Sequence, residues 1–171
     1  MDFAGSRMRC AEALGRLSGV LTHDHQRWLL GSFCALGRVA FDPGLFAQRY
    51  PPPGSAHTFA GACEELGLTL EVRRGGLDAL LAWRLPLALE VTSASGLDWL
   101  LVLNADEHRA VVLERGAPAP VALELQSLRR RCRGTALCLG PQAEAAADPD
   151  LIEPRSARFG LHWFLPELLK H

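Results

Sequence analysis

The order of apolar and polar residues changes its period after the first third of the chain. Apolar residues recur at helical spacing over residues 24–39, which predicts an amphipathic helix with Asp24 as its N-terminal cap. Asp42-Pro43 predicts the start of a short second helix, and Ser55 predicts the start of a third helix that ends before Gly67. We therefore expect the first third to be helical.

Beyond Gly67 apolar residues alternate with polar ones, or gather in short runs between turn-forming stretches. This pattern is typical of an antiparallel sheet, and it predicts strands at residues 68–72, 87–91, 99–103, 110–113, 121–123 and 136–139. Residues 126–132 fit a short helix before the last strand. Helices first and strands second indicate the α+β class.

The composition narrows the class of protein without naming its function. The chain has 171 residues, of which 49% are hydrophobic and 22% charged, with a net charge of −1. This is ordinary for one globular domain, and the near-zero charge disfavours a nucleic-acid partner. No stretch reaches the roughly 18 apolar residues of a membrane span, and no signal peptide is visible, so we expect a chain that is neither secreted nor membrane-spanning.

The cysteines and the paired histidines give weak signals for metal or disulfide chemistry. The five cysteines are an odd number without CxxC spacing, which indicates reduced, cytoplasmic thiols. His23-Asp24-His25 has a spacing that suits few metal geometries, so polar capping is favoured. We expect no metal and no cofactor.

The C-terminal segment, FGLHWFLPELLKH, carries the most specific signal in the sequence. It resembles the junction in haemolysin-type (RTX) transporters of type I secretion, ABC transporters in which a cytoplasmic N-terminal domain leads into the first membrane helix. The matching residues are Phe159, Trp163, Phe164, Pro166 and Lys170.

The N-terminal domain of that family is similar to the bacteriocin-processing cysteine peptidases, whose fold is papain-like. Asp42-Pro43, Arg49-Tyr50 and the segments 59–68 and 128–134 match it. The resemblance implies N-terminal helices packed on an antiparallel sheet. Together with the residue pattern, it divides the chain into four expected parts: a helical extension over 1–22 that the family does not usually carry, a peptidase-like domain over 23–140, a linker over 141–158 and the junction over 159–171.

The resemblance also locates the catalytic positions. The nucleophile position of the family's Asp-Cys-Gly motif falls on His25, the histidine position on Asp98, and the orienting acid on Glu114, while the oxyanion glutamine position falls on Gly19. Removing the nucleophile alone costs most of the rate in such sites. We therefore expect a degenerate site without catalytic residues, a pseudo-peptidase that is not an enzyme, with His25 within hydrogen-bond distance of Asp98.

An active peptidase with a displaced nucleophile is the competing interpretation. Its thiol would be Cys10, Cys34 or Cys63, and its base one of the histidines at 23, 57 and 108. Cys34 and Cys63 lie on apolar helical faces, where thiols usually pack in the core. Cys10 follows Arg9, which lowers a thiol pKa, but no histidine lies at the expected register.

The implied function is docking of an unfolded secreted protein, often a glycine-rich calcium-binding repeat toxin, before export. Trp28 and Trp99 are the expected substrate contacts. The other expected partner is the rest of the transporter, on the cytoplasmic side of the bacterial inner membrane, with membrane contact only through the region after His171. The sequence favours a solvated helix face for Arg129, Arg130, Arg131 and Arg133 over a contact with acidic headgroups or with the adjoining transporter. The alternatives are an active peptidase that removes a Gly-Gly leader, or a free-standing cytosolic adaptor.

Overall fold

The computed structural model describes residues 21–141. The helical extension expected before residue 21, and nearly all of the linker and junction expected after residue 140, lie outside these residues. The aromatic residues of the junction, Phe159, Trp163 and Phe164, lie outside them as well, as do Pro166 and Lys170. The four-part division therefore stays a prediction.

Three helices come first: α2 (His23–Gly37), α3 (Pro43–Arg49) and α4 (Ala56–Glu65). The Asp42 and Ser55 side chains cap α3 and α4 as the sequence predicts. The prediction that Asp24 caps α2 is wrong, because the Thr22 hydroxyl accepts the His25 backbone N–H and the helix begins one residue earlier.

A six-stranded antiparallel sheet follows, in the spatial order β1-β6-β2-β3-β4-β5. Its strands are β1 (Leu68–Arg74), β2 (Leu87–Ser93), β3 (Gly96–Ala105), β4 (Arg109–Glu114), β5 (Val121–Glu124) and β6 (Cys132–Pro141). Gly67 precedes β1 with a positive φ of 66°, a conformation that a glycine adopts without strain. Two short helices accompany the strands: α5 (Leu77–Leu81), which the sequence pattern did not predict, and α6 (Leu125–Arg131). Five residues are too few to show a helical period. The α+β prediction is confirmed.

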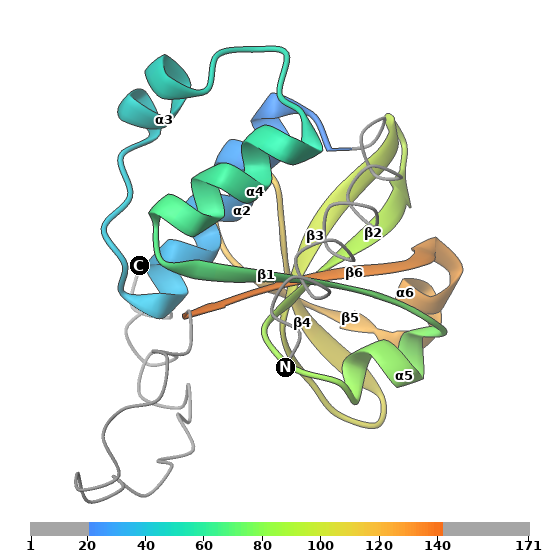
Figure 1. Ribbon diagram of the computed structural model, residues 1–171. Coiled ribbons are helices and arrows are strands. Elements are labelled where there is room, and N and C mark those ends of the chain that lie inside the picture. The colour runs from blue at the N-terminus through green and yellow to red at the C-terminus, as the bar shows by residue number, and fades with distance from the viewer. Residues whose placement is uncertain (1–20, 142–171) are drawn as a thin grey trace, which may run out of the picture.

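The sheet separates two apolar cores. Figure 1 shows α2 and α4 side by side against one part of the sheet, with α5 and α6 near its other end. Ala88 of β2 packs in the core with α2 and α4, whereas Leu87 and Leu89 pack with α5 and α6. This alternation explains why β2 reads as a continuous apolar run: both of its faces are covered.

Candidate functional site

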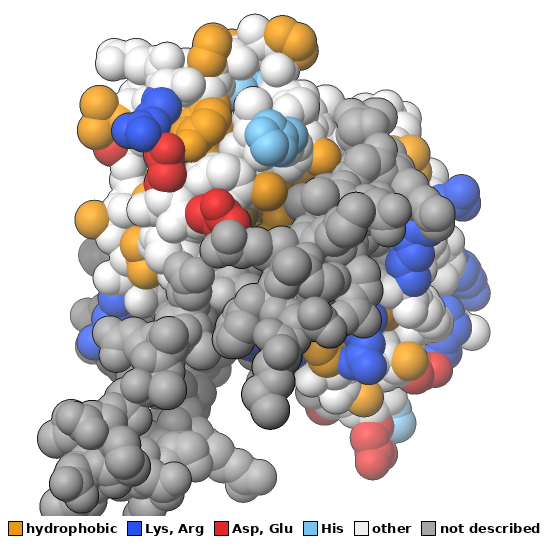
Figure 2. Space-filling model, in the orientation of Figure 1, with side chains coloured by type: hydrophobic (Ala, Val, Ile, Leu, Met, Phe, Trp, Pro, Cys, Tyr) orange, Lys and Arg blue, Asp and Glu red, His pale blue; other side chains and the backbone are white. Residues whose placement is uncertain are grey.

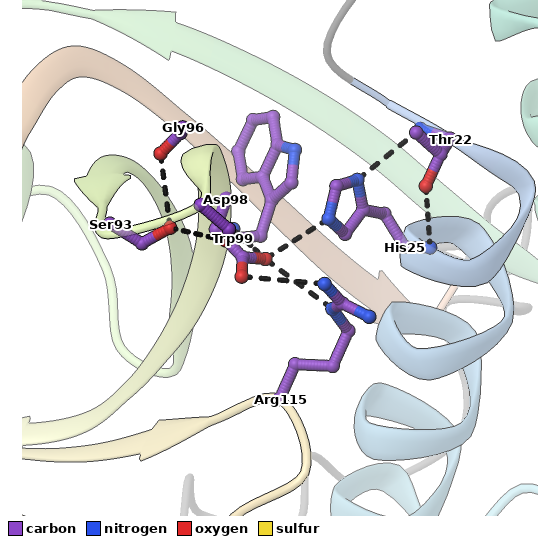
Figure 3. Close-up of polar contacts among 8 residues, drawn as sticks. Thr22, His25, Ser93, Gly96, Asp98, Trp99 and Arg115 are labelled. Atoms are coloured by element: carbon purple, nitrogen blue, oxygen red, sulfur yellow. Dashed lines mark hydrogen bonds and ion pairs between the residues drawn. The ribbon is translucent and has the colours of Figure 1, made fainter.

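His25 connects the start of helix α2 to the sheet. Its imidazole Nδ1 accepts the backbone N–H of Thr22 at 3.3 Å, which completes a capping box with the Thr22 hydroxyl. Its Nε2 lies 3.0 Å from Asp98 Oδ1 on β3 (Figure 3). The expected proximity of His25 and Asp98 is therefore confirmed.

The capping box determines which ring nitrogen of a neutral His25 carries the proton. A nitrogen that accepts a backbone N–H has no hydrogen of its own, so the proton of the neutral ring lies on Nε2. Nε2 faces the Asp98 carboxylate, and the His25 side chain is only 6% exposed. The ring is thus held by one contact at each nitrogen, which fixes its orientation at the junction of helix and sheet.

The Asp98 carboxylate has three partners: His25, Arg115 and the backbone N–H of Trp99 in its own strand. Its Oδ1 accepts the Trp99 backbone N–H at 2.8 Å, and Arg115 Nε and Nη2 donate to its two oxygens at 3.4 Å each. Burial of the carboxyl disfavours the charged form, but the Trp99 N–H, the Arg115 guanidinium and His25 outweigh it and lower the pKa of Asp98 below its usual value. Asp98 is therefore an anion held between two basic side chains.

Arg115, the residue after Glu114, is the one that contacts the Asp98 carboxylate. Glu114 pairs with Leu100, a residue of the core that packs with α5 and α6, and its carboxylate lies 2.7 Å from Arg131 Nη1 of α6. Glu114, the expected orienting acid, thus lies against Arg131 in this structure, and its assigned role stays a prediction. No motif in the sequence singled out Arg115.

Gln26 and Gly54 form the neighbouring wall, and the sequence analysis did not single them out as site residues. The fully buried Gln26 side chain donates from Nε2 to the backbone carbonyls of Leu21 at 3.2 Å and Ser55 at 3.1 Å. A Cβ at Gly54 would lie 2.9 Å from Gln26 Nε2 and Oε1. Glycine at 54 thus lets the loop before α4 come close enough for Gln26 to fasten it.

The two tryptophans expected to contact substrate differ in exposure. Trp99 is 1% exposed and packs in the core with α2 and α4, so in this conformation it offers no surface to a ligand. Trp28 is half-buried and packs against the same core. The exposed apolar side chain next to Asp98 is Leu97, at 45%.

The thiols of the described residues are mostly core groups. Cys34, Cys63 and Cys138 are buried and Cys132 is half-buried. Burial raises the pKa of the Cys34 thiol above its usual value. The interpretation of Cys34 and Cys63 as packing thiols is confirmed, while Cys10 lies outside the described residues.

His23, the other histidine of the His23-Asp24-His25 run, also has a structural partner. His23 Nε2 lies 2.8 Å from the Tyr50 carbonyl oxygen, and its ring stacks on Phe46 at 5.3 Å between centroids, so it ties α2 to α3. Within residues 21–141 no group of three or more His, Cys, Asp or Glu side chains could hold a metal ion. Among the same residues no helix is long and apolar enough to span a membrane.

Comparison with solved structures identifies the fold around this site. The peptidase domain of Streptococcus ComA, a bi-functional ABC transporter, superposes with a TM-score of 0.58 at 13% identity, covering 70% of this chain and 92% of that one. The N-terminal peptidase C39 like domain of the toxin secretion ATP-binding protein of Vibrio parahaemolyticus gives 0.55 at 18% identity, with 66% and 93% coverage. The chain has the fold of C39 peptidase domains.

A third solved structure with the C39 peptidase fold contains a bound peptide. It is a double glycine motif protease from an AMS/PCAT transporter in complex with the leader peptide, with a TM-score of 0.57 at 13% identity, covering 68% of this chain and 83% of that one. No family model matches the sequence, and no curated protein matches it. The resemblance deduced from the sequence is thus confirmed for the fold.

These comparisons correct one prediction. The expectation that the chain is a pseudo-peptidase and not an enzyme is wrong, because the solved domains with this fold are cysteine peptidase domains of ABC transporters and nothing in the described residues shows inactivity. Hydrolysis of a peptide by this domain is therefore a question for measurement. The roles assigned to His25, Asp98 and the two tryptophans stay predictions.

Proposed function

We propose that this domain binds an unfolded segment of a secreted protein for an ABC transporter of the type I secretion kind, on the cytoplasmic side of the membrane. The observation that carries the proposal is the charged cluster of His25, Asp98 and Arg115 at the junction of helix and sheet, in a fold that binds a leader peptide in a transporter protease. The secreted partner we propose is a glycine-rich calcium-binding repeat protein, and the second partner is the rest of the transporter.

The cluster has the exposure and the contact lengths that peptide binding needs. The Asp98 and Arg115 side chains are 20% and 39% exposed, and their two hydrogen bonds are long, at 3.4 Å. Long, partly solvated bonds can be exchanged for bonds to a peptide at low cost, because water already competes for the same groups. Leu97, which precedes Asp98, adds an exposed apolar contact.

An unfolded chain offers backbone N–H and C=O groups that a folded one has already paired. Asp98 accepts hydrogen bonds and Arg115 donates them, so together they match both kinds of backbone group. Binding must also offset the entropy of ordering the chain, so we expect a dissociation constant on the order of micromolar. Folding of the substrate with calcium should abolish the interaction.

A titration of fluorescent calcium-binding repeat polypeptide tests this function. We expect binding in chelator, loss of binding in calcium, and a roughly tenfold weaker complex for Arg115→Glu. Arg109→Glu makes the same charge change at an exposed arginine of β4 and should bind as the native protein does. Equal binding to folded and unfolded polypeptide would overturn the proposal.

Hydrolysis of a leader peptide is the second candidate function, and the likeness to the double glycine motif protease favours it. A nucleophile must be accessible, and three of the four described thiols are buried. Mass spectrometry of a double-glycine peptide incubated with the full chain, and with its Cys10→Ser variant, distinguishes the outcomes. A fragment that ends after the glycine pair and disappears with Cys10→Ser would assign hydrolysis to that thiol.

A further inference from the structure

A basic surface lies around α5 and α6, the helices that pack with the second core. Figure 2 shows Lys and Arg side chains gathered on the side where, in Figure 1, α5 and α6 lie beside the end of β1 and the start of β6. Seven arginines belong to these elements and their connections: Arg73, Arg74, Arg84, Arg129, Arg130, Arg131 and Arg133. We call them the arginine surface.

Only part of this charge is neutralised. Arg84, Arg129 and Arg131 have carboxylate partners in Glu71, Asp78 and Glu114. Arg73, Arg74, Arg130 and Arg133 are exposed, and within the described residues none of the four lies in an ion pair. The described residues carry equal numbers of basic and acidic side chains, twelve of each, so this excess is local.

The backbone brings the segments that carry these four arginines to the same end of the sheet. The Gly75 N–H donates to the Gly134 carbonyl at 3.0 Å, which joins the residue after Arg74 to the residue after Arg133. Arg130 lies in the last turn of α6 and Arg133 near the start of β6, and the pair of Arg129 with Asp78 at 2.7 Å fastens α6 to α5. The surface is therefore built on fixed elements.

An indole lies within this surface. The Arg73 guanidinium lies over the Trp83 ring at 5.3 Å from its centroid, and Trp83 is half-buried. Guanidinium groups bind phosphate through two parallel hydrogen bonds, and indole rings favour the boundary between headgroups and acyl chains. Phosphate-binding arginines beside a tryptophan suit a lipid surface better than an acidic polypeptide, which offers no apolar layer.

We propose that the arginine surface binds the headgroups of anionic phospholipids and so orients the domain on a membrane. This inference rests on the proposed function in one respect: a domain of a transporter works beside a bilayer. It adds a membrane contact within the folded domain to the one expected only after His171. Attraction to a negative leaflet acts through each exposed arginine, and salt screens it.

Sedimentation with lipid vesicles tests the proposal on the full chain, without any secreted polypeptide present. The vesicles contain phosphatidylcholine alone, or phosphatidylcholine with 30% phosphatidylglycerol. We expect binding to the anionic vesicles only, weakened by 0.5 M NaCl, and reduced about 30-fold or more in Arg130→Glu/Arg133→Glu. Arg130→Gln/Arg133→Gln is the milder variant should the reversal impair folding, and it should also weaken binding.

The matched control is Arg27→Glu/Arg49→Glu, which makes the same charge change on α2 and α3. It should bind anionic vesicles nearly as well as the native chain does. The C-terminal residues are identical in all variants, so a difference in vesicle binding between two variants reports on the arginine surface. Equal vesicle binding by both double variants, or a preference for polyglutamate over anionic vesicles, would overturn the proposal. Peptide binding is measured without vesicles, so failure of one proposal leaves the other testable.

Discussion

His25 carries two structural tasks through its two ring nitrogens. Nδ1 closes the capping box of helix α2, and Nε2 faces the Asp98 carboxylate. A cysteine or alanine at this position has no ring nitrogen to accept the Thr22 N–H. At the scale of single residues, the site thus depends on contacts between side chains. Asp98 is contacted by His25 and by the more exposed Arg115.

Arg115→Gln should raise the pKa of Asp98, because it removes a cation that favours the carboxylate. The folded-state pKa of Asp98 lies below its ordinary value, so this group stabilises the fold above about pH 4 and the stabilisation is lost as the pH falls through the folded pKa. Carbon-13 NMR titration of the carboxyl measures the shift directly. Arg27→Gln, at an arginine paired with Asp24, is the control. Equal titration of Asp98 in native protein and Arg115→Gln would contradict the prediction.

Gly54→Ala should destabilise the fold by about 1 to 3 kcal/mol, since its Cβ would overlap the Gln26 amide. Gln26 cannot turn away without losing its bonds to Leu21 and Ser55. Gly76→Ala is the control, because a Cβ there meets nothing within 4 Å. Urea unfolding compares the two, and equal midpoints would show that the loop adjusts freely.

At the scale of elements, the start of α2 and the start of α4 form the helical side of the site. Each begins with a capping box, Thr22 with His25 in α2 and Ser55 with Thr58 in α4. Gln26 links the two starts through the Ser55 carbonyl. The β2–β3 hairpin supplies the other side through Asp98. Both helix starts therefore help to set the distance across the site.

Thr22→Ala and Ser55→Ala should each lower the free energy of unfolding by about 1 kcal/mol, the usual cost of losing a side-chain cap. Only Thr22→Ala should also weaken binding of the unfolded polypeptide, because it removes the hydroxyl that accepts the His25 backbone N–H. Thermal unfolding and the fluorescence titration give the two quantities. Equal effects of both variants on binding would mean that the His25 contact with Asp98 does not depend on the cap.

At the scale of the whole molecule, one antiparallel sheet serves two cores with different helices. The proposed peptide contacts lie where α2 meets β3, and the arginine surface lies around α5 and α6. Under the two proposals, the domain binds a substrate through the first surface and a membrane through the second.

Cys34 of α2 and Cys138 of β6 are both buried, so they should resist alkylation until the domain unfolds. Burial raises the pKa of both thiols; at Cys138, Arg84 opposes this effect and Glu71 adds to it. Among the described thiols we expect half-buried Cys132 to react first with iodoacetamide. Raised thiol pKa values stabilise the fold below about pH 8.5, and that stabilisation is lost as the pH rises through the folded values. Peptide mapping in increasing urea follows each thiol, and rapid labelling of Cys34 in native protein would contradict the buried assignment.

The sequence alone predicted every described element except α5, because local physics selects them. Helical spacing predicted α2, the caps Asp42 and Ser55 predicted the starts of α3 and α4, and short apolar runs predicted the six strands. These signals act over a few residues and survive any tertiary arrangement. The alignment with a known family further brought His25 and Asp98 together, and that proximity is confirmed.

Only the tertiary structure decided which charged groups meet. Arg115 reaches Asp98 from another strand connection, Glu114 turns away to Arg131, and Gln26 fastens the loop before α4. The helix α5 also appears only in the fold, where Leu77 and Leu80 fill the second core. Pairing between distant residues depends on strand register and on which face of the sheet a side chain occupies, and a shift of one residue reverses that face. The local pattern of the chain specifies neither the strand register nor the face of the sheet, so both depend on tertiary packing.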